Sequence, residues 1–253
     1  MTNSLLRSLP TISFFATIFF SSSSIASFSS FDRHKLEIEN KPEFKLIKKA
    51  DDKKQAFIDY FYPIIVNNNI DLLKKRDRVK KSRSGKDVLD LCDKYNENCK
   101  SPKYKNRLLS KLDIILPSIA IAQGALESGW GSSNYAVKGN NYFGIYCYSP
   151  KCGILNKKGA KPKKYSTPIE SISDYFFTIN NHQAYKKLRN IRVSSKRADD
   201  WYLGLKKYSI KSSYPKMLNR IVNDNDLKEI DLKMFDYLSD KKIYTAKSLN
   251  ITK

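Results

Sequence analysis

Hydrophobic residues recur at three- and four-residue intervals in the stretch that begins near Asp51. This spacing places them on one face of an amphipathic helix, with charged residues on the other face. The apolar positions are Ala56, Phe57, Tyr60, Phe61, Ile64 and Ile65. Pro63 lies within the pattern and is expected to kink or interrupt the helix, because proline lacks the backbone N–H and crowds the preceding turn.

Further helical patterns follow along the chain. We expect a short helix over residues 87–95, after a basic connector at 79–86, and a helical stretch over 104–131 that breaks near Pro117. Helical spacing resumes at 167–191, where Thr167 can cap, Pro168 can occupy the first helical position and Glu170 lies in the first turn. Residues 198–208 and 212–227 predict two more short helices.

The segment from residue 131 to 167 differs, because it is rich in Gly, Asn, Tyr, Lys and Pro with short alternating runs such as YFGIYCYS. It predicts loops and a small β-hairpin. No internal repeat is evident. The expected architecture is therefore a mainly α (α+β) domain with one β-containing insertion at its centre.

The N-terminus has the layout of a secretory signal peptide over residues 1–26. Arg7 supplies the positive start, residues 9–20 are apolar, and Ser24 and Ala26 stand at positions −3 and −1 of a cleavage site. The apolar run of about 12 residues is short for a bilayer core of about 30 Å, although an uncleaved anchor is the alternative. Residues 27–50 are expected to be a flexible lead-in to one domain over 51–253. The mature protein is expected in the periplasm or cell envelope.

The chain carries 47 Lys+Arg against 25 Asp+Glu, a formal net charge of +22. Such a surplus attracts polyanions, and nucleic acid, anionic lipid and an acidic cell wall are all candidates. A merely lysine-rich surface is the plain alternative. Export argues against nucleic acid, so we expect peripheral contact with an anionic wall. The composition, 41% hydrophobic and 12% aromatic, excludes a disordered protein.

Four cysteines occur in two local pairs, Cys92 with Cys99 and Cys147 with Cys152. In an oxidising compartment an even count in local pairs predicts two short-loop disulfides. Zinc is disfavoured because neither spacing is of the zinc-knuckle type and only two histidines are present. We therefore expect no metal, and the same scarcity argues against a catalytic triad. His182 is interpreted as a surface or supporting residue.

A single carboxylate, Glu127, ends the otherwise apolar helix PSIAIAQGALES, just before Gly129 and Gly131. Apolar surroundings and the negative end of the helix dipole are both expected to raise the pKa of Glu127. A glycosidase needs such a protonated acid to donate to a leaving sugar oxygen. The alternative is an ionised Glu paired with Lys or Arg at the helix end.

The motif AQGALESGWG followed by GNNYFGI resembles the glucosaminidase domain of glycoside hydrolase family 73, the mannosyl-glycoprotein endo-β-N-acetylglucosaminidase type. The Bax-like branch is most similar, because its CxxxxCG element matches Cys147, Cys152 and Gly153. Weaker matches extend the resemblance over residues 51–227, with a core at about 106–227. The resemblance implies a lysozyme-like helical lobe, a small β-containing lobe and a glycan groove between them.

By that resemblance Glu127 is the general acid and Tyr208 is a supporting tyrosine near it. The residues expected to line the groove are Trp130, Tyr135, Asn141, Tyr142 and Phe143. The chain departs from the family pattern because residues 146–169 contain no Asp or Glu. Glu170 and Asp174 follow, but their helix-start positions favour a structural role. A second catalytic carboxylate is therefore in doubt.

The leading hypothesis is a monomeric peptidoglycan hydrolase that needs no cofactor and cleaves the β-1,4 bond after N-acetylglucosamine in glycan strands. A lytic transglycosylase or muramidase acting on the same polymer is the first alternative. A non-catalytic cell-wall-binding protein is the second.

Overall fold

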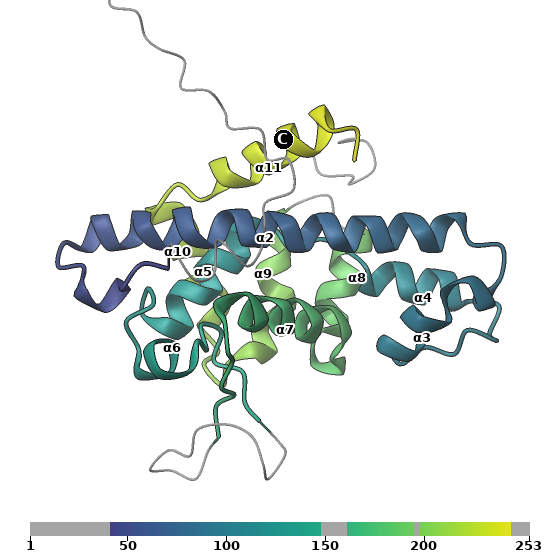
Figure 1. The fold of residues 1–253 in the computed structure, drawn as a ribbon, viewed down its shortest axis with the longest axis horizontal. Helices are drawn as coiled ribbons and strands as arrows, with labels where there is room; N and C mark the ends of the chain where they lie inside the picture. The colour runs from purple at the N-terminus through teal and green to yellow at the C-terminus, as the bar shows by residue number, and fades with distance from the viewer. Residues whose placement is uncertain (1–40, 148–160, 195–197, 244–253) are drawn as a thin grey trace, which may run out of the picture.

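The computed structural model describes residues 41–147, 161–194 and 198–243. Helices dominate these residues, which confirms the mainly α expectation (Figure 1). The first half contains η1 (Phe44–Leu46), α2 (Ala50–Lys81), η2 (Gly85–Val88), α3 (Leu89–Lys94), α4 (Tyr104–Lys111), α5 (Pro117–Ser128) and α6 (Asn134–Gly139). The second half contains α7 (Pro168–Asn181), η3 (Gln183–Tyr185), α8 (Lys186–Ser194), η4 (Ala198–Asp200), α9 (Trp201–Gly204), η5 (Lys206–Tyr208), α10 (Tyr214–Asp224) and α11 (Lys228–Asp240).

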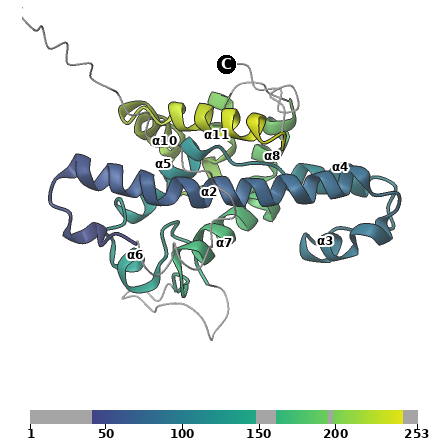
Figure 2. The ribbon, with the colours of Figure 1, turned by 45° about the horizontal axis from the view of Figure 1, so that its top comes forward.

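The 32-residue helix α2 runs along the long axis of the molecule and contacts α4, α5 and α7 (Figures 1 and 2). Pro63 lies inside it without ending it, so the expected interruption is wrong. Tyr60, Phe61, Ile64 and Ile65 bracket the proline and are all buried. Tertiary packing on both sides of Pro63 thus stabilises a helix that the isolated sequence would weaken there.

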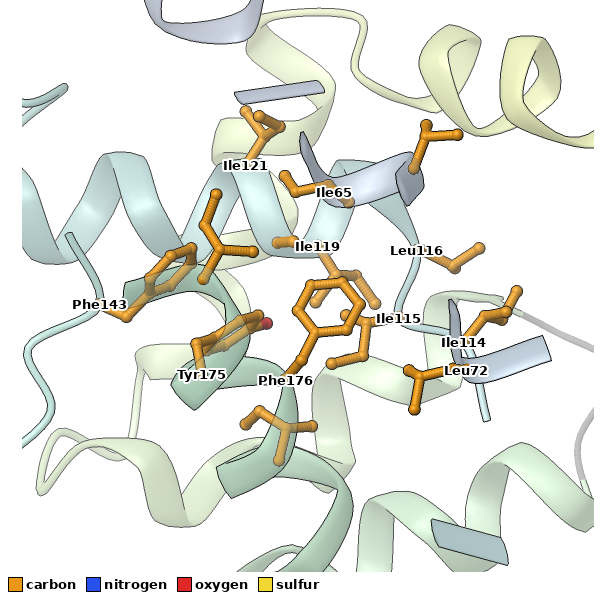
Figure 3. Close-up of a cluster of buried hydrophobic side chains, with 14 of the residues drawn as sticks. Ile65, Leu72, Ile114, Ile115, Leu116, Ile119, Ile121, Phe143, Tyr175 and Phe176 are labelled. Carbon is orange, nitrogen blue, oxygen red and sulfur yellow. The ribbon is translucent and has the colours of Figure 1, made fainter. Parts of the chain in front are cut away.

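Helix α5 is the centre of the core, because α2, α10 and α11 all pack against it. Its residues from Pro117 to Ala125 are buried, and isoleucines of α5 and of the segment before it project into the cluster drawn in Figure 3. The N-terminus of α5 is capped from α11. There Asp231 accepts hydrogen bonds from the Ser118 amide (2.8 Å) and the Ser118 hydroxyl (2.5 Å).

The described end of the expected lead-in is packed rather than flexible. Phe44 is buried against the rings of Phe57 and Phe61 from α2, at centroid distances of 5.4 and 6.0 Å. It also presses on Gly131, where a Cβ would collide with the ring. The packed structure therefore begins before the expected boundary at residue 51. The expected signal peptide lies outside the described residues.

The central insertion contains less β-structure and more helix than expected. Its pairing is a single antiparallel bridge between Tyr146 and Pro162, within the residues that the structure describes. Two hydrogen bonds flank it: the Cys147 amide donates to Lys161 and the Lys163 amide donates to Ile145. The short helix α6, capped by the Ser133 hydroxyl, was not expected.

The sequence signals at the start of α7 are confirmed. The Thr167 hydroxyl accepts from the Glu170 amide, and Pro168 opens the helix. The helix ends at Asn181, and His182 is an exposed capping residue, so the stretch 167–191 forms three elements rather than one. Helix α11 was not expected. No helix in the described part of the chain is long and apolar enough to cross a membrane.

The expected disulfide between Cys92 and Cys99 is present and closes the loop after α3. Cys147 is also disulfide-bonded, and its expected partner, Cys152, lies outside the described residues.

Candidate active site

Glu127 lies in the last turn of α5, where the helix ends in a left-handed turn. Gly129, Trp130 and Gly131 all have positive φ angles, of 58°, 53° and 78°. The Ser128 hydroxyl stabilises the turn by accepting from the Gly131 amide at 2.8 Å. The chain therefore leaves the helix abruptly and exposes part of the Glu127 side chain.

A chain of hydrogen bonds ends on one oxygen of Glu127. The Tyr214 hydroxyl, from α10, donates to Oε1 of Glu127 at 2.8 Å. Gln123 Nε2 donates to that hydroxyl at 3.1 Å, and the Tyr175 hydroxyl donates to Gln123 Oε1 at 2.6 Å. Because each group donates toward Glu127, the orientation of the Tyr214 hydroxyl is fixed by the buried Gln123 on one side and by the partly buried Glu127 on the other.

The other oxygen of Glu127, Oε2, accepts no hydrogen bond from the described residues. Gly144 lies over it, with φ of +63°, and a Cβ at this position would come within 3.1 Å of Oε2. The absence of a side chain at Gly144 therefore leaves room beside the carboxyl group, which a substrate oxygen could occupy.

Burial raises the pKa of Glu127 above its ordinary value, and this effect exceeds two opposing ones. The hydrogen bond from Tyr214 and the positive charge of Lys211 both lower the pKa. No salt bridge joins Glu127 to a described Lys or Arg within 4.0 Å. The alternative of an ionised Glu held by a cation is therefore disfavoured, and the arrangement suits a proton donor.

Tyr208 lies close to this group but does not contact Glu127 through a hydrogen bond. Its hydroxyl donates to the Phe143 carbonyl at 2.6 Å, and its ring stacks on Tyr214 with a centroid distance of 5.7 Å. Tyr208 thus holds both the backbone before Gly144 and the ring of Tyr214. Its position favours the expected supporting role, as a positioning residue.

Three residues expected to line a groove are buried instead, each with 1% of its surface exposed: Asn141, Tyr142 and Phe143. The Asn141 amide donates to the carbonyls of Ile145 and Lys163 and so joins the two sides of the β-bridge. The Tyr142 ring packs on Phe61 at 4.7 Å, and the Phe143 ring stacks on Tyr175 at 4.0 Å (Figure 3). Their side chains therefore pack in the interior of the domain, in place of the exposed positions expected for them.

Trp130 and Tyr135 are partly exposed, so both stay compatible with substrate contact. The Trp130 ring meets Phe57 edge-on at 5.6 Å, which fixes it beside the end of α5. Tyr135 lies in α6, immediately after the turn.

The two acids that follow the acid-free stretch have structural partners. Glu170 accepts from the Ser166 amide at the start of α7. Asp174 accepts from Lys163 Nζ at 2.7 Å and from the Tyr165 hydroxyl at 2.6 Å. Both side chains hold the second side of the β-bridge to α7, in agreement with the structural role expected for them.

Gln123 and Tyr214 belong to the site but were not anticipated. Gln123 could have been found, because it is a polar residue one helical turn before Glu127 in an otherwise apolar helix. Tyr214 carries no such signal, since its contact depends on how α10 crosses α5.

Comparison with known proteins finds similarity to a protein-family model and to individual proteins. The family model described as glucosaminidase, mannosyl-glycoprotein endo-beta-N-acetylglucosaminidase, matches residues 102–227. Protein bax of Escherichia coli (strain K12) is 27% identical over 219 residues, which cover 79% of this chain and 80% of that protein. Exo-glucosaminidase LytG of Bacillus subtilis (strain 168) is 32% identical over 133 residues, 46% of each chain.

Among solved structures, the catalytic domain of the autolysin Auto from Listeria monocytogenes matches with a TM-score of 0.45 and 21% identity. The match covers 73% of this chain and 91% of that one.

Proposed function

Because this chain belongs to the glucosaminidase family of glycoside hydrolases, we propose that it hydrolyses the β-1,4 bond after N-acetylglucosamine in peptidoglycan, with Glu127 as the general acid. The observation that carries the proposal is the state of the Glu127 carboxyl group. It is buried enough to raise its pKa, it is oriented through Oε1 by Tyr214, and its Oε2 is left without a partner among the described residues.

In the proposed reaction Glu127 transfers its proton to the glycosidic oxygen as the bond from that oxygen to the anomeric carbon breaks. The departing sugar keeps the proton, and positive charge develops on the remaining ring as an oxocarbenium-like transition state. Water then adds to the anomeric carbon and gives up a proton, which returns to the Glu127 carboxylate. Tyr214 stabilises the carboxylate that Glu127 becomes after the transfer, because a hydrogen bond to a charged acceptor is stronger than one to a neutral acceptor.

The attack on the anomeric carbon is proposed to proceed without a second protein carboxylate near the β-bridge. Residues 146–169 contain no Asp or Glu, and the next two acids are bound to other groups. The carbonyl oxygen of the substrate's N-acetyl group can bond to the anomeric carbon as the glycosidic bond breaks, and the water described above then opens that ring and restores the N-acetyl group, as in other glycosidases that use substrate assistance.

The presence of a single acid at the site, without a second carboxylate near the β-bridge, also favours a second candidate, a lytic transglycosylase or muramidase. A lone acid can serve a transglycosylase, in which a hydroxyl of the substrate attacks in place of water and leaves an anhydro-muramic end. The two reactions differ in their products, and the fold does not distinguish them.

The test is digestion of purified sacculi by the wild-type protein and by Glu127→Gln, with the products identified by mass spectrometry. We expect reducing N-acetylglucosamine ends from the wild type and a loss of activity of about a thousandfold or more in the variant. Glu170→Gln is the matched control, because it removes an acid that only caps α7. Anhydro-muramic ends would indicate a lytic transglycosylase and reducing N-acetylmuramic ends a muramidase. Equal activity of wild type and Glu127→Gln would exclude Glu127 as the acid.

We further propose that the protein acts as a monomer outside the cytoplasm, at the cell envelope, where its substrate lies. Its net positive charge of +22 would hold it on an anionic wall, and salt should weaken that contact.

A further inference from the structure

A polar cavity of about 450 Å³ lies between α4 and α8, away from Glu127. In Figures 1 and 2, α3 and α4 lie at one end of α2, whereas α6, which follows Glu127 in the chain, lies toward the other end. None of the residues that line the cavity takes part in the hydrogen bonds around Glu127.

The charge of this cavity is strongly positive. Five cationic side chains and one carboxylate line it: Lys103, Arg107, Lys111, Lys186, Arg189 and Glu97. The surplus of four positive charges is concentrated in a partly enclosed space, where screening by water is weaker than on an open surface. An anion that enters would relieve the mutual repulsion of these groups.

Two of the cations are held rigidly in the floor of the cavity. Arg189 has 4% of its surface exposed and donates through Nη1 to the His182 carbonyl at 2.9 Å. Among the described residues no carboxylate lies within salt-bridge distance of Arg189, and its hydrogen bonds to them use Nη1 alone, so Nε and Nη2 are available. Lys111, with 7% exposed, is fixed by the Tyr95 carbonyl at 2.6 Å and by Glu97 at 2.8 Å.

The walls are also fixed in place. Arg107 binds Glu97 at 2.6 Å, and the disulfide from Cys92 to Cys99 closes the loop that carries Glu97. On the other side, Arg192 of α8 donates to the Ser110 carbonyl at 3.1 Å and so holds α8 against the end of α4. A preorganised cluster of this kind binds an anion without a large ordering cost.

Lys103 and Lys186 stand at the rim. Both are exposed, and neither side-chain ammonium group makes a hydrogen bond or ion pair with the described residues. They can therefore close over an anion that is already bound to Arg189 in the floor, since lysine ammonium groups on flexible stems adapt to phosphate oxygens.

We propose that this cavity between α4 and α8 is a binding site for a phosphate group, distinct from the glycosidase site. Phosphate fits better than carboxylate, because a carboxylate carries one charge and two acceptor oxygens, whereas phosphate offers more of both to the five cations. The volume also exceeds that of a lone ion, so the phosphate can belong to a larger molecule, either a soluble phosphodiester polymer or a lipid headgroup.

The test is a calorimetric titration of the full chain with inorganic phosphate at fixed ionic strength, with acetate as the comparison anion. The cavity variant is Lys103→Gln/Lys186→Gln, and the matched control is Lys74→Gln/Lys80→Gln, which removes two exposed, unpaired lysines of α2 and the same net charge. We expect saturable binding by wild type and control, and binding weaker by about tenfold in the cavity variant. Arg189→Lys, which keeps the charge but loses the planar guanidinium, should weaken phosphate binding as well.

Equal affinity in the cavity and control variants, absence of saturable binding to the wild type, or acetate binding as tight as phosphate would each overturn the proposal. Glu127→Gln should bind phosphate like the wild type, so a failure of the glycosidase proposal would not affect this result. The source of the phosphate is identified with two further probes, poly(glycerol phosphate) and phosphatidylcholine vesicles with or without phosphatidylglycerol. The affinity of the cavity variant and of the control variant is measured for each probe. A probe that binds the cavity variant more weakly than the control identifies the source of the phosphate.

Discussion

The Tyr214 hydroxyl donates to Oε1 of Glu127 at 2.8 Å, across a sequence separation of 87 residues. This contact joins α10 to the end of α5 and selects which carboxyl oxygen is left for a substrate. It also lowers the pKa of Glu127 against the larger, raising effect of burial.

Tyr214→Phe should therefore move the pH dependence of hydrolysis in a defined direction. An acid catalyst is active while protonated, so activity falls as the pH rises through the pKa of Glu127. Removing the hydroxyl removes an interaction that lowers this pKa, and the alkaline limb of the kcat/KM profile should move to higher pH. The maximal rate should fall by roughly tenfold, because one charge-assisted hydrogen bond is lost.

Tyr208→Phe is the contrast for that measurement, since its hydroxyl binds the Phe143 carbonyl and not Glu127. Its alkaline limb should stay near the wild-type position. An unmoved limb in Tyr214→Phe would mean that Glu127 does not set the profile.

Gly144→Ala and Gly129→Ala form a matched pair. Both glycines have positive φ, of 63° and 58°, so each alanine pays a similar backbone cost of roughly 1–2 kcal/mol in stability. Only at Gly144 would the new Cβ approach Glu127, at 3.1 Å from Oε2, whereas nothing lies within 4 Å at Gly129. We expect Gly144→Ala to lose at least about tenfold more activity than Gly129→Ala. Equal activity of the two folded variants would show that the space at Gly144 does not contribute to catalysis.

Asp231 should make the stability of the fold depend on pH. Burial raises the pKa of this carboxyl group to about 7, although hydrogen bonds from Ser118 and the charge of Lys228 oppose the shift. In the unfolded chain the pKa is about 3.9. Between these two values the folded state binds the extra proton, so the free energy of unfolding falls as the pH rises from about 4 to about 7.

Asp231→Asn cannot titrate and should lack that decline. The difference between wild type and variant should change by about 4 kcal/mol across this window and level off above it. Urea unfolding of both proteins at a series of pH values measures the difference. Parallel curves would show that Asp231 has the same pKa in the folded and unfolded states.

The Cys92–Cys99 disulfide closes a short loop, with a sequence separation of 7. The double variant Cys92→Ser/Cys99→Ser should lose about 2.5 kcal/mol of stability, by the loop-entropy argument. Denaturant unfolding of the variant, compared with the wild type under oxidising conditions, provides the test. A loss well below 1 kcal/mol would indicate that the loop is ordered without its covalent bond.

The sequence predicts most helices because burial imposes a three- and four-residue spacing on them, as in α2 and α7. It does not predict that α2 continues through Pro63, since that depends on packing from both sides. Helix α6 is too short to show a period, and it lies among glycines and polar residues.

The candidate site was predicted in part, for a physical reason. A lone carboxylate in an apolar helix is conspicuous, so Glu127 could be identified from the sequence. Tyr142 and Phe143 were assigned to a substrate surface, but they are core residues, and the part of their motif that faces Glu127 is the backbone at Gly144. The packing of helices that are distant in sequence decides which side of a motif faces the core. A local sequence pattern therefore does not predict it.

Helix α11 lies outside the segment that matches the glucosaminidase family, yet it packs on α5 and supplies the carboxylate that caps it. A fragment trimmed to the matched segment would leave the first turn of α5 without its acceptor and would bare apolar surface along the helix that presents Glu127. We therefore expect a fragment limited to the matched segment to be less stable than the whole domain, and substitutions in α11 to lower hydrolysis although they lie far from the carboxyl group.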